Sequence, residues 1–166
     1  MIVFDANVLI SLCTGDENDE MFERITGVIQ DAVAAKMIIG VPAPAWAEFL
    51  CGTGIATSGV IDVLKKRSAI RILPFDEVAA TELAAIDSAT RAKGGKKGAS
   101  KSQWQKVKID RQILAIARVV KATAIYTEDT GLIAEAQRLN VVAVKTSEVP
   151  LKPKQNTLDL QDPSIE

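Results

Sequence analysis

Short apolar runs alternate with amphipathic segments along most of this chain, and this order limits the fold more than any other feature. The alternation calls for a parallel sheet covered by helices. The predicted strands are Ile2–Phe4, Met37–Val41, Ile70–Leu73, Ala122–Tyr126 and Val141–Val144. Apolar residues at three- and four-residue spacing predict helices at Ala6–Ile10, Glu17–Ala35, Ala45–Cys51, Val60–Arg67, Glu77–Arg91, Ile109–Val120 and Thr130–Leu139.

The chain has 166 residues, enough for one domain that buries about two-thirds of the surface of its unfolded chain. The last segment, 150–166, has three prolines and little periodicity. We therefore expect one domain over residues 1–149 and a tail over 150–166 that lies on the surface or on a partner.

The residues that are missing exclude several kinds of chemistry. The sequence has no histidine, which excludes Cys/His zinc sites and the Ser-His and Cys-His nucleophile pairs. The two cysteines, Cys13 and Cys51, have no metal-ligand spacing, and we expect both in or near the core. We also expect a cytoplasmic protein, because two cysteines do not indicate a secreted disulfide scaffold and no basic n-region precedes the first predicted strand. No apolar run approaches the roughly 20 residues that span a bilayer.

Four acidic residues stand where the predicted elements could bring them together. Asp5 ends the first predicted strand, and Glu48 lies one turn into a helix among apolar neighbours. Asp110 stands at the start of a predicted helix, and Asp129 lies between a strand and a helix. Taken singly, Asp110 and Asp129 could simply stabilise helix N-termini, and Glu48 could be a solvated helix residue.

A cluster of all four carboxylates would need a cation. Mutual repulsion would raise some of their pKa values and destabilise the fold unless a positive charge neutralised them. Oxygen ligands favour Mg²⁺ or Mn²⁺ over zinc. We therefore expect one or two of these ions at the carboxylates.

A basic segment follows the helix predicted at Glu77–Arg91. Residues 91–108 contain seven basic residues, three glycines and no acidic residue, which predicts a flexible basic loop at 93–107. We expect Lys96, Lys97 and Lys101 to contact the phosphates of a nucleic acid, although a solvated insertion is an equal alternative. Trp104 could stack on an unpaired base, or it could anchor the loop to the body of the protein.

Four sequence segments, in order, make the chain resemble the PIN-domain ribonuclease family, and within it the VapC-type toxins of bacterial toxin–antitoxin systems. The segments are Phe4–Leu9, Pro42–Leu50, Asp110–Ala117 and Tyr126–Asp129. The resemblance covers roughly residues 1–145 and implies a three-layer α/β/α fold with a central parallel sheet of about four to five strands.

The resemblance also implies roles for individual residues. Asp5, Glu48, Asp110 and Asp129 would be the catalytic and metal-binding residues, with Asn7 and Thr127 as supporting polar groups. Two departures from the family pattern stand out. Ala6 replaces a frequent hydroxyl residue, and Arg111 follows Asp110 where smaller or apolar residues are usual, so we expect Arg111 to alter the charge of the site or to contact RNA.

The function implied is that of a metal-dependent endoribonuclease acting as the toxin of a toxin–antitoxin pair, with a small antitoxin and a second copy of the chain as partners. A non-catalytic PIN-like module that binds RNA or forms complexes is the first alternative. A Mg²⁺-dependent phosphatase similar to haloacid dehalogenases is the second, but that chemistry expects an aspartate where Asn7 stands.

Overall fold

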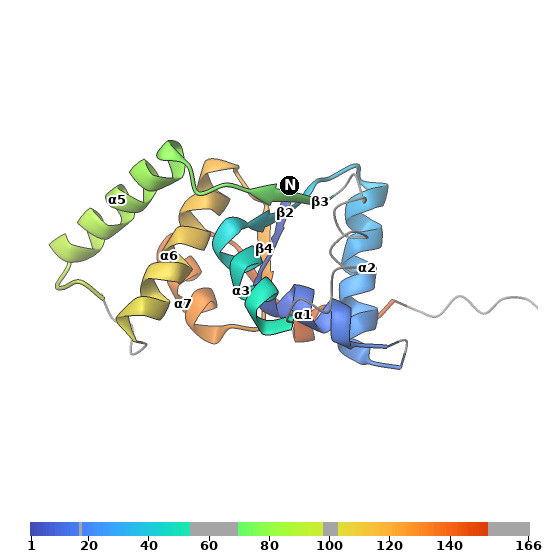
Figure 1. Cartoon of the computed structure of the whole chain (residues 1–166). Coiled ribbons are helices and arrows are strands. Elements are labelled where there is room, and N and C mark those ends of the chain that lie inside the picture. The colour runs from blue at the N-terminus through green and yellow to red at the C-terminus, as the bar shows by residue number, and fades with distance from the viewer. Residues whose placement is uncertain (17, 54–69, 98–102, 153–166) are drawn as a thin grey trace, which may run out of the picture.

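One parallel sheet forms the centre of the protein in a computed structural model that describes residues 1–16, 18–53, 70–97 and 103–152 (Figure 1). Within these residues the sheet has five strands in the order β3-β2-β1-β4-β5. The strands are β1 (Ile2–Phe4), β2 (Ile39–Pro42), β3 (Ile70–Leu73), β4 (Ala124–Thr127) and β5 (Ala143–Lys145). All five predicted strands are therefore confirmed.

The strand order creates a crevice next to β1. Strands β2 and β3 lie on one side of β1 within the sheet, and β4 and β5 lie on the other side of β1. Phe4 of β1 pairs with Tyr126 of β4, so the two strands end side by side. Open α/β sheets bind ligands outside the carboxyl ends of the strands at such a reversal.

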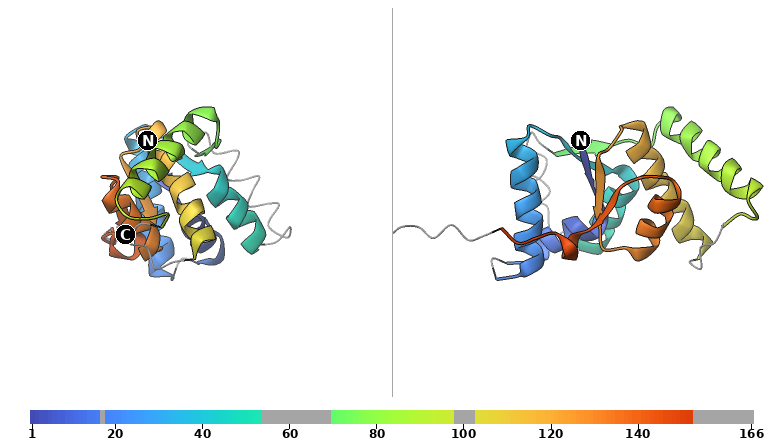
Figure 2. Two further views of the ribbon diagram at one scale, coloured as in Figure 1. Left: turned by 90° about the vertical axis from the view of Figure 1, so that its left-hand side faces the viewer. Right: turned by 180° about the vertical axis from the view of Figure 1, so that it is seen from behind.

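Helices cover both faces of the sheet and complete the three layers. Figures 1 and 2 show α2 on one side, α6 and α7 on the other, and α5 beside α6. The helices are α1 (Ala6–Thr14), α2 (Glu20–Ala34), α3 (Ala43–Thr53), α5 (Glu77–Ala92), α6 (Trp104–Val119) and α7 (Thr130–Arg138), and a short 3₁₀ helix, η2, spans Thr146–Glu148. In the ranges that the structure describes, none of these helices is long and apolar enough to cross a bilayer.

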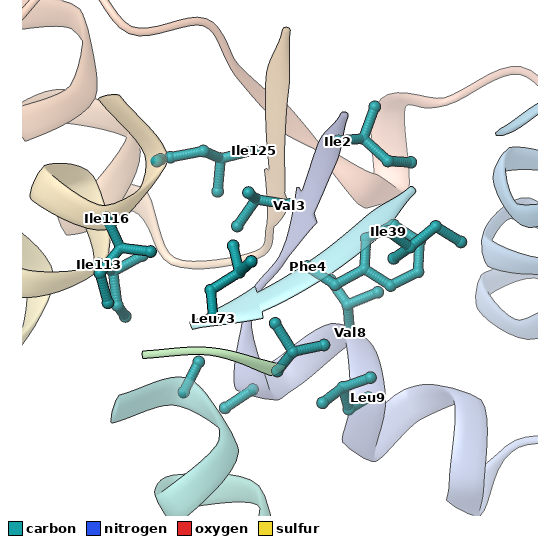
Figure 3. Packing of buried hydrophobic residues seen from close by; sticks show 14 of the residues in the cluster. Ile2, Val3, Phe4, Val8, Leu9, Ile39, Leu73, Ile113, Ile116 and Ile125 are labelled. Atoms are coloured by element: carbon teal, nitrogen blue, oxygen red, sulfur yellow. The ribbon is translucent and has the colours of Figure 1, made fainter. Parts of the chain in front are cut away.

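The core lies on both faces of β1. Val3 and Phe4 are almost completely buried, as are Ile39 of β2 and Ile125 of β4 (Figure 3). The ring of Phe4 meets that of Tyr126 edge to face, with 5.8 Å between ring centroids. Strands buried on both faces have nearly continuous apolar sequences, which is why these short runs were recognisable.

Three strands were predicted to start two residues too early. The same kind of turn precedes each of these strands and explains the error. A residue with positive φ ends the preceding helix, and the next residue donates its N–H to a carbonyl five positions back, which is a Schellman motif. The positive-φ residues are Lys36, Lys121 and Asn140, and the bonds run from Met37 to Ala32, Ala122 to Ala117 and Val141 to Ala136. The apolar residue that was predicted to open each strand therefore closes the helix instead.

The loop predicted at 93–107 does not extend to residue 107. Helix α6 begins at Trp104, so residues 104–107 of the predicted loop are helical. The break comes earlier, at Gly94 and Gly95, which both have positive φ. The helix predicted at 60–67 and the side chain of Lys101 fall outside the described residues.

The two cysteines differ in their surroundings. Cys13 is half-buried against the core, as expected, whereas Cys51 is exposed on α3. The expectation that Cys51 lies in or near the core is therefore wrong.

Candidate active site

A cavity of about 620 Å³ opens at the carboxyl edge of the sheet, and all four predicted acidic residues line it. Each comes from a different place in the fold. Asp5 lies at the junction of β1 and α1, Glu48 on α3, Asp110 on α6, and Asp129 at the junction of β4 and α7. Elements far apart in the sequence thus bring these carboxylates to one place.

Asp5 is fixed in position by hydrogen bonds on both carboxylate oxygens. It is the N-cap of α1, where Oδ1 accepts a 2.8 Å bond from the N–H of Ala6. Its Oδ2 accepts bonds from the Thr127 hydroxyl at 2.7 Å and from Asn7 Nδ2 at 2.9 Å. Asp5 is only 5% exposed, and burial raises its pKa despite these bonds.

Thr127 and Asn7 join the ends of β1 and β4. The fully buried Thr127 hydroxyl accepts bonds from Asn7 Nδ2 at 3.1 Å and from the Asp129 N–H at 3.0 Å. Asn7 Oδ1 also accepts the N–H of Glu128 at 3.1 Å. The structure therefore brings both predicted supporting residues against Asp5.

Asp129 combines helix capping with a place in the cavity. Its Oδ1 accepts the N–H groups of Gly131 and Leu132 at the start of α7, as the capping interpretation predicted. Its Oδ2 pairs with the ammonium group of Lys106. Burial favours a higher pKa for Asp129, but the bonds from Lys106 and the two N–H groups outweigh it and hold the pKa below the ordinary value.

The other two carboxylates differ in exposure. Glu48 is exposed on α3, whereas Asp110 is 7% exposed and lies beyond the first turn of α6. The prediction that Asp110 stands at a helix N-terminus is therefore wrong. Burial raises the pKa of Asp110 to about 6; Lys106 opposes this rise, while the charges of Asp129 and Asp5 add to it.

Lys106 is the site residue that the sequence prediction missed. It was counted only as part of the basic segment, but its side chain lines the cavity among the acids. Its pKa is raised: burial lowers it, but the hydrogen bond with Asp129 and the charges of Asp110, Asp129 and Glu48 more than compensate. The sequence feature that could have identified Lys106 is its spacing of four residues from Asp110, because this spacing places both side chains on one face of a helix.

The donor atoms suit a hard divalent cation. The four acids offer only oxygen ligands, as Mg²⁺ and Mn²⁺ prefer. Burial raises the pKa values of Asp5 and Asp110, and a bound cation would favour their charged forms. Among the described residues, no three acidic or sulfur-bearing side chains already stand in position to hold an ion. The carboxylates fit a cation by their chemistry, and binding would require them to move closer together.

Arg111 does not face the cavity or the solvent. Its side chain is completely buried and pairs with Asp87 at 2.7 Å and with Glu135 at 2.9 Å. The prediction that Arg111 contacts RNA is therefore wrong, because its charge is used to join α6 to α5 and α7.

The ring of Trp104 contacts two cationic side chains of the protein. The Lys96 ammonium lies 4.5 Å from the centroid of its ring, and the Arg111 guanidinium lies 5.8 Å from it. These cation–π contacts agree with the interpretation of Trp104 as an anchor for the basic segment. Contact of Lys96, Lys97 or Lys101 with RNA stays a prediction.

The fold and the cavity define a class: three-layer α/β/α proteins with an acidic site at the point where the strand order reverses. The PIN domain family profile matches residues 2–139. The chain therefore belongs to the PIN-domain family. No curated protein matches the sequence.

Solved structures agree with this assignment. VapBC2 from Rickettsia felis, bound to a DNA fragment from its promoter, is 14% identical, with a TM-score of 0.61 over 87% of this chain and 98% of that chain. A toxin–antitoxin complex from Klebsiella pneumoniae is 17% identical, with a TM-score of 0.55 over 88% and 98%. VapC20 from Mycobacterium tuberculosis, a toxin that cleaves the sarcin–ricin loop, is 13% identical, with a TM-score of 0.51 over 81% and 94%. At these identities the likeness establishes the fold.

Proposed function

We propose that this protein is a metal-dependent endoribonuclease and the toxin of a toxin–antitoxin pair. The observation that carries the proposal is the convergence of Asp5, Glu48, Asp110 and Asp129 on one cavity at the carboxyl edge of the sheet. Membership of the PIN-domain family supports the same activity.

In this proposal, the four carboxylates hold one or two Mg²⁺ or Mn²⁺ ions. A bound ion would lower the pKa of a water molecule and stabilise charge on the phosphodiester. Asn7 and Thr127 hold the Asp5 carboxylate in position at the cavity through their hydrogen bonds to Oδ2. No histidine is needed for this chemistry, in agreement with the composition.

The proposal also includes two protein partners. The solved structures from Rickettsia felis and Klebsiella pneumoniae are toxin–antitoxin complexes, which supports a small antitoxin as the inhibitor of this chain. We further propose a homodimer. Sedimentation equilibrium of the purified chain would test the dimer, and a single mass equal to one chain at micromolar concentration would contradict it.

Cleavage of a mixed pool of single-stranded and structured RNA tests the proposed activity. Wild type should cleave with Mg²⁺ or Mn²⁺ and not with EDTA, and Asp5→Asn should be inactive although folded. Asp31→Asn, which changes an exposed acid on α2, is the matched control and should cleave like wild type. Equal cleavage by Asp5→Asn would contradict the proposal. RNA binding by a folded wild type that never cleaves would favour the non-catalytic module.

A further inference from the structure

Lys106 places a positive charge inside the acidic cavity. Its side chain is 47% exposed and reaches from the first turn of α6 to the carboxylate of Asp129, which is 22% exposed. Of the cavity-lining residues in the part of the chain that the structure describes, Lys106 is the one cation among four carboxylates. The ammonium group therefore neutralises part of the cluster from within.

The position of Lys106 puts it in competition with any ion that binds Asp129. Oδ1 of Asp129 is held by the N–H groups of Gly131 and Leu132 at the start of α7. Oδ2 is thus the oxygen that could face a metal ion, and it is the oxygen that Lys106 contacts. The two cations share one carboxylate oxygen.

A released Lys106 ammonium would lie close to the substrate. The side chain is long and flexible, and its base is fixed on α6 one turn before Asp110. A divalent ion at the carboxylates would repel the ammonium, and the nearest new anion would be the phosphate brought to the cavity. Lysine binds phosphate as a point charge, without the fixed geometry that arginine needs.

We propose that Lys106 is a substrate-contacting residue of this site, whose ammonium leaves Oδ2 of Asp129 when a divalent cation binds and then contacts a phosphate oxygen of the RNA. This inference rests on the proposed function for the identity of the substrate. The contact itself is a property of the cavity and can be measured without cleavage.

Two binding measurements on Lys106→Gln, Lys106→Arg and Lys121→Gln test the inference. Lys121 is exposed just beyond the other end of α6 and serves as the control. In calorimetry with Mn²⁺ alone, Lys106→Gln should bind the ion about fivefold more tightly than wild type, because it has lost a competing cation. With uridine monophosphate added to the Mn²⁺-loaded protein, Lys106→Gln should bind about tenfold more weakly, whereas Lys106→Arg keeps most of the affinity.

Each outcome decides a part of the proposal. Unchanged Mn²⁺ affinity in Lys106→Gln would overturn the competition for Asp129, and unchanged nucleotide affinity would overturn the contact with phosphate. Lys121→Gln should match wild type in both titrations, and circular dichroism confirms that each variant is folded. If wild type cleaves no RNA while both binding changes appear, the proposed function fails and Lys106 still stands as a phosphate-binding residue.

Discussion

The Thr127 hydroxyl donates a 2.7 Å hydrogen bond to Oδ2 of Asp5, and this bond joins residues 122 positions apart in the sequence. It links the end of β4 to the end of β1, where the strand order reverses. Because the same hydroxyl accepts the Asp129 N–H, one buried oxygen atom connects two of the four acids in the cavity.

Replacing Thr127 by valine should cost both stability and activity. The change keeps the shape of the side chain but removes one of the three hydrogen bonds to the buried Asp5 carboxylate and leaves the Asp129 N–H without its acceptor, which costs about 1–3 kcal/mol of unfolding free energy. Thr127→Ser keeps the hydroxyl and should lose only about 1 kcal/mol for the missing methyl group. Urea unfolding and RNA cleavage measure the two effects. Activity in Thr127→Val equal to that in Thr127→Ser would show that the hydroxyl is dispensable.

The stability of the metal-free protein should fall as the pH rises through the titration of Asp110. Its pKa is about 6 in the folded protein and 3.8 ordinarily, so between these values the folded state binds the proton more tightly than the unfolded state. The charged form therefore destabilises the fold, and the loss is complete above about pH 6. Asp129, whose pKa is lowered, acts in the opposite direction, and its contribution is lost only at lower pH.

Asp110→Asn removes the part of this pH dependence that Asp110 contributes, whereas Asp5, whose pKa is also raised, keeps its own part. In EDTA the variant should melt at a higher temperature than wild type at pH 7.5, and the difference should shrink as the pH approaches 4. Melting curves across this range, with Asp31→Asn as the control, measure the effect. Parallel curves for wild type and Asp110→Asn would contradict the raised pKa.

Truncating Arg111 should destabilise the fold far more than truncating Arg118 on the same helix. Arg111→Met removes the buried partner of Asp87 and Glu135, which costs about 3 kcal/mol, the lower end for a broken buried pair, because Glu135 keeps its pair with Arg138. Arg118 pairs with Glu82 at 3.0 Å, but its side chain is 42% exposed, so Arg118→Met should cost less than about 1 kcal/mol. Adding Glu135→Leu to Arg111→Met should recover part of the loss. Equal unfolding free energies for the two arginine variants would refute the structural role.

Neutralising Lys96, Lys97 and Lys101 together should weaken RNA binding and flatten its salt dependence. If each lysine meets one phosphate, the slope of log affinity against log salt should fall by about 2 in magnitude for a single strand. Fluorescence anisotropy at several salt concentrations measures the slope. Lys36→Gln with Lys121→Gln removes exposed charge elsewhere and is the control. An unchanged slope in the triple variant would make the segment a solvated insertion.

The strands and the four acids could be predicted because local patterns mark them. Buried parallel strands are continuous apolar runs, and Asp5 and Asp129 both follow a strand and cap a helix. The start of α6 carries no such mark: its N-cap, Gln103, makes no side-chain capping bond. The prediction therefore started the helix five residues late and placed Asp110 in its first turn.

The partners of charged side chains could not be predicted in the same way. Lys106 and Arg111 both lie on α6 next to Asp110, yet one reaches the cavity and the other is buried against α5 and α7. That difference depends on which helices pack beside each face of α6, and this is a property of the tertiary fold. The sequence prediction counted Lys106 only as part of the basic segment, and it expected Arg111 to alter the charge of the site or to contact RNA.

The chemistry of the RNA ends after cleavage tests the central claim most directly. An end-labelled RNA is incubated with Mn²⁺ and either wild type or Asp5→Asn, and the new termini are identified by mass spectrometry. Attack by a metal-activated water predicts Mn²⁺-dependent products without a 2′,3′-cyclic phosphate, formed by wild type alone. Cyclic phosphate ends, or the same products from Asp5→Asn, would contradict the assignment of the acidic cavity as a metal-dependent ribonuclease site.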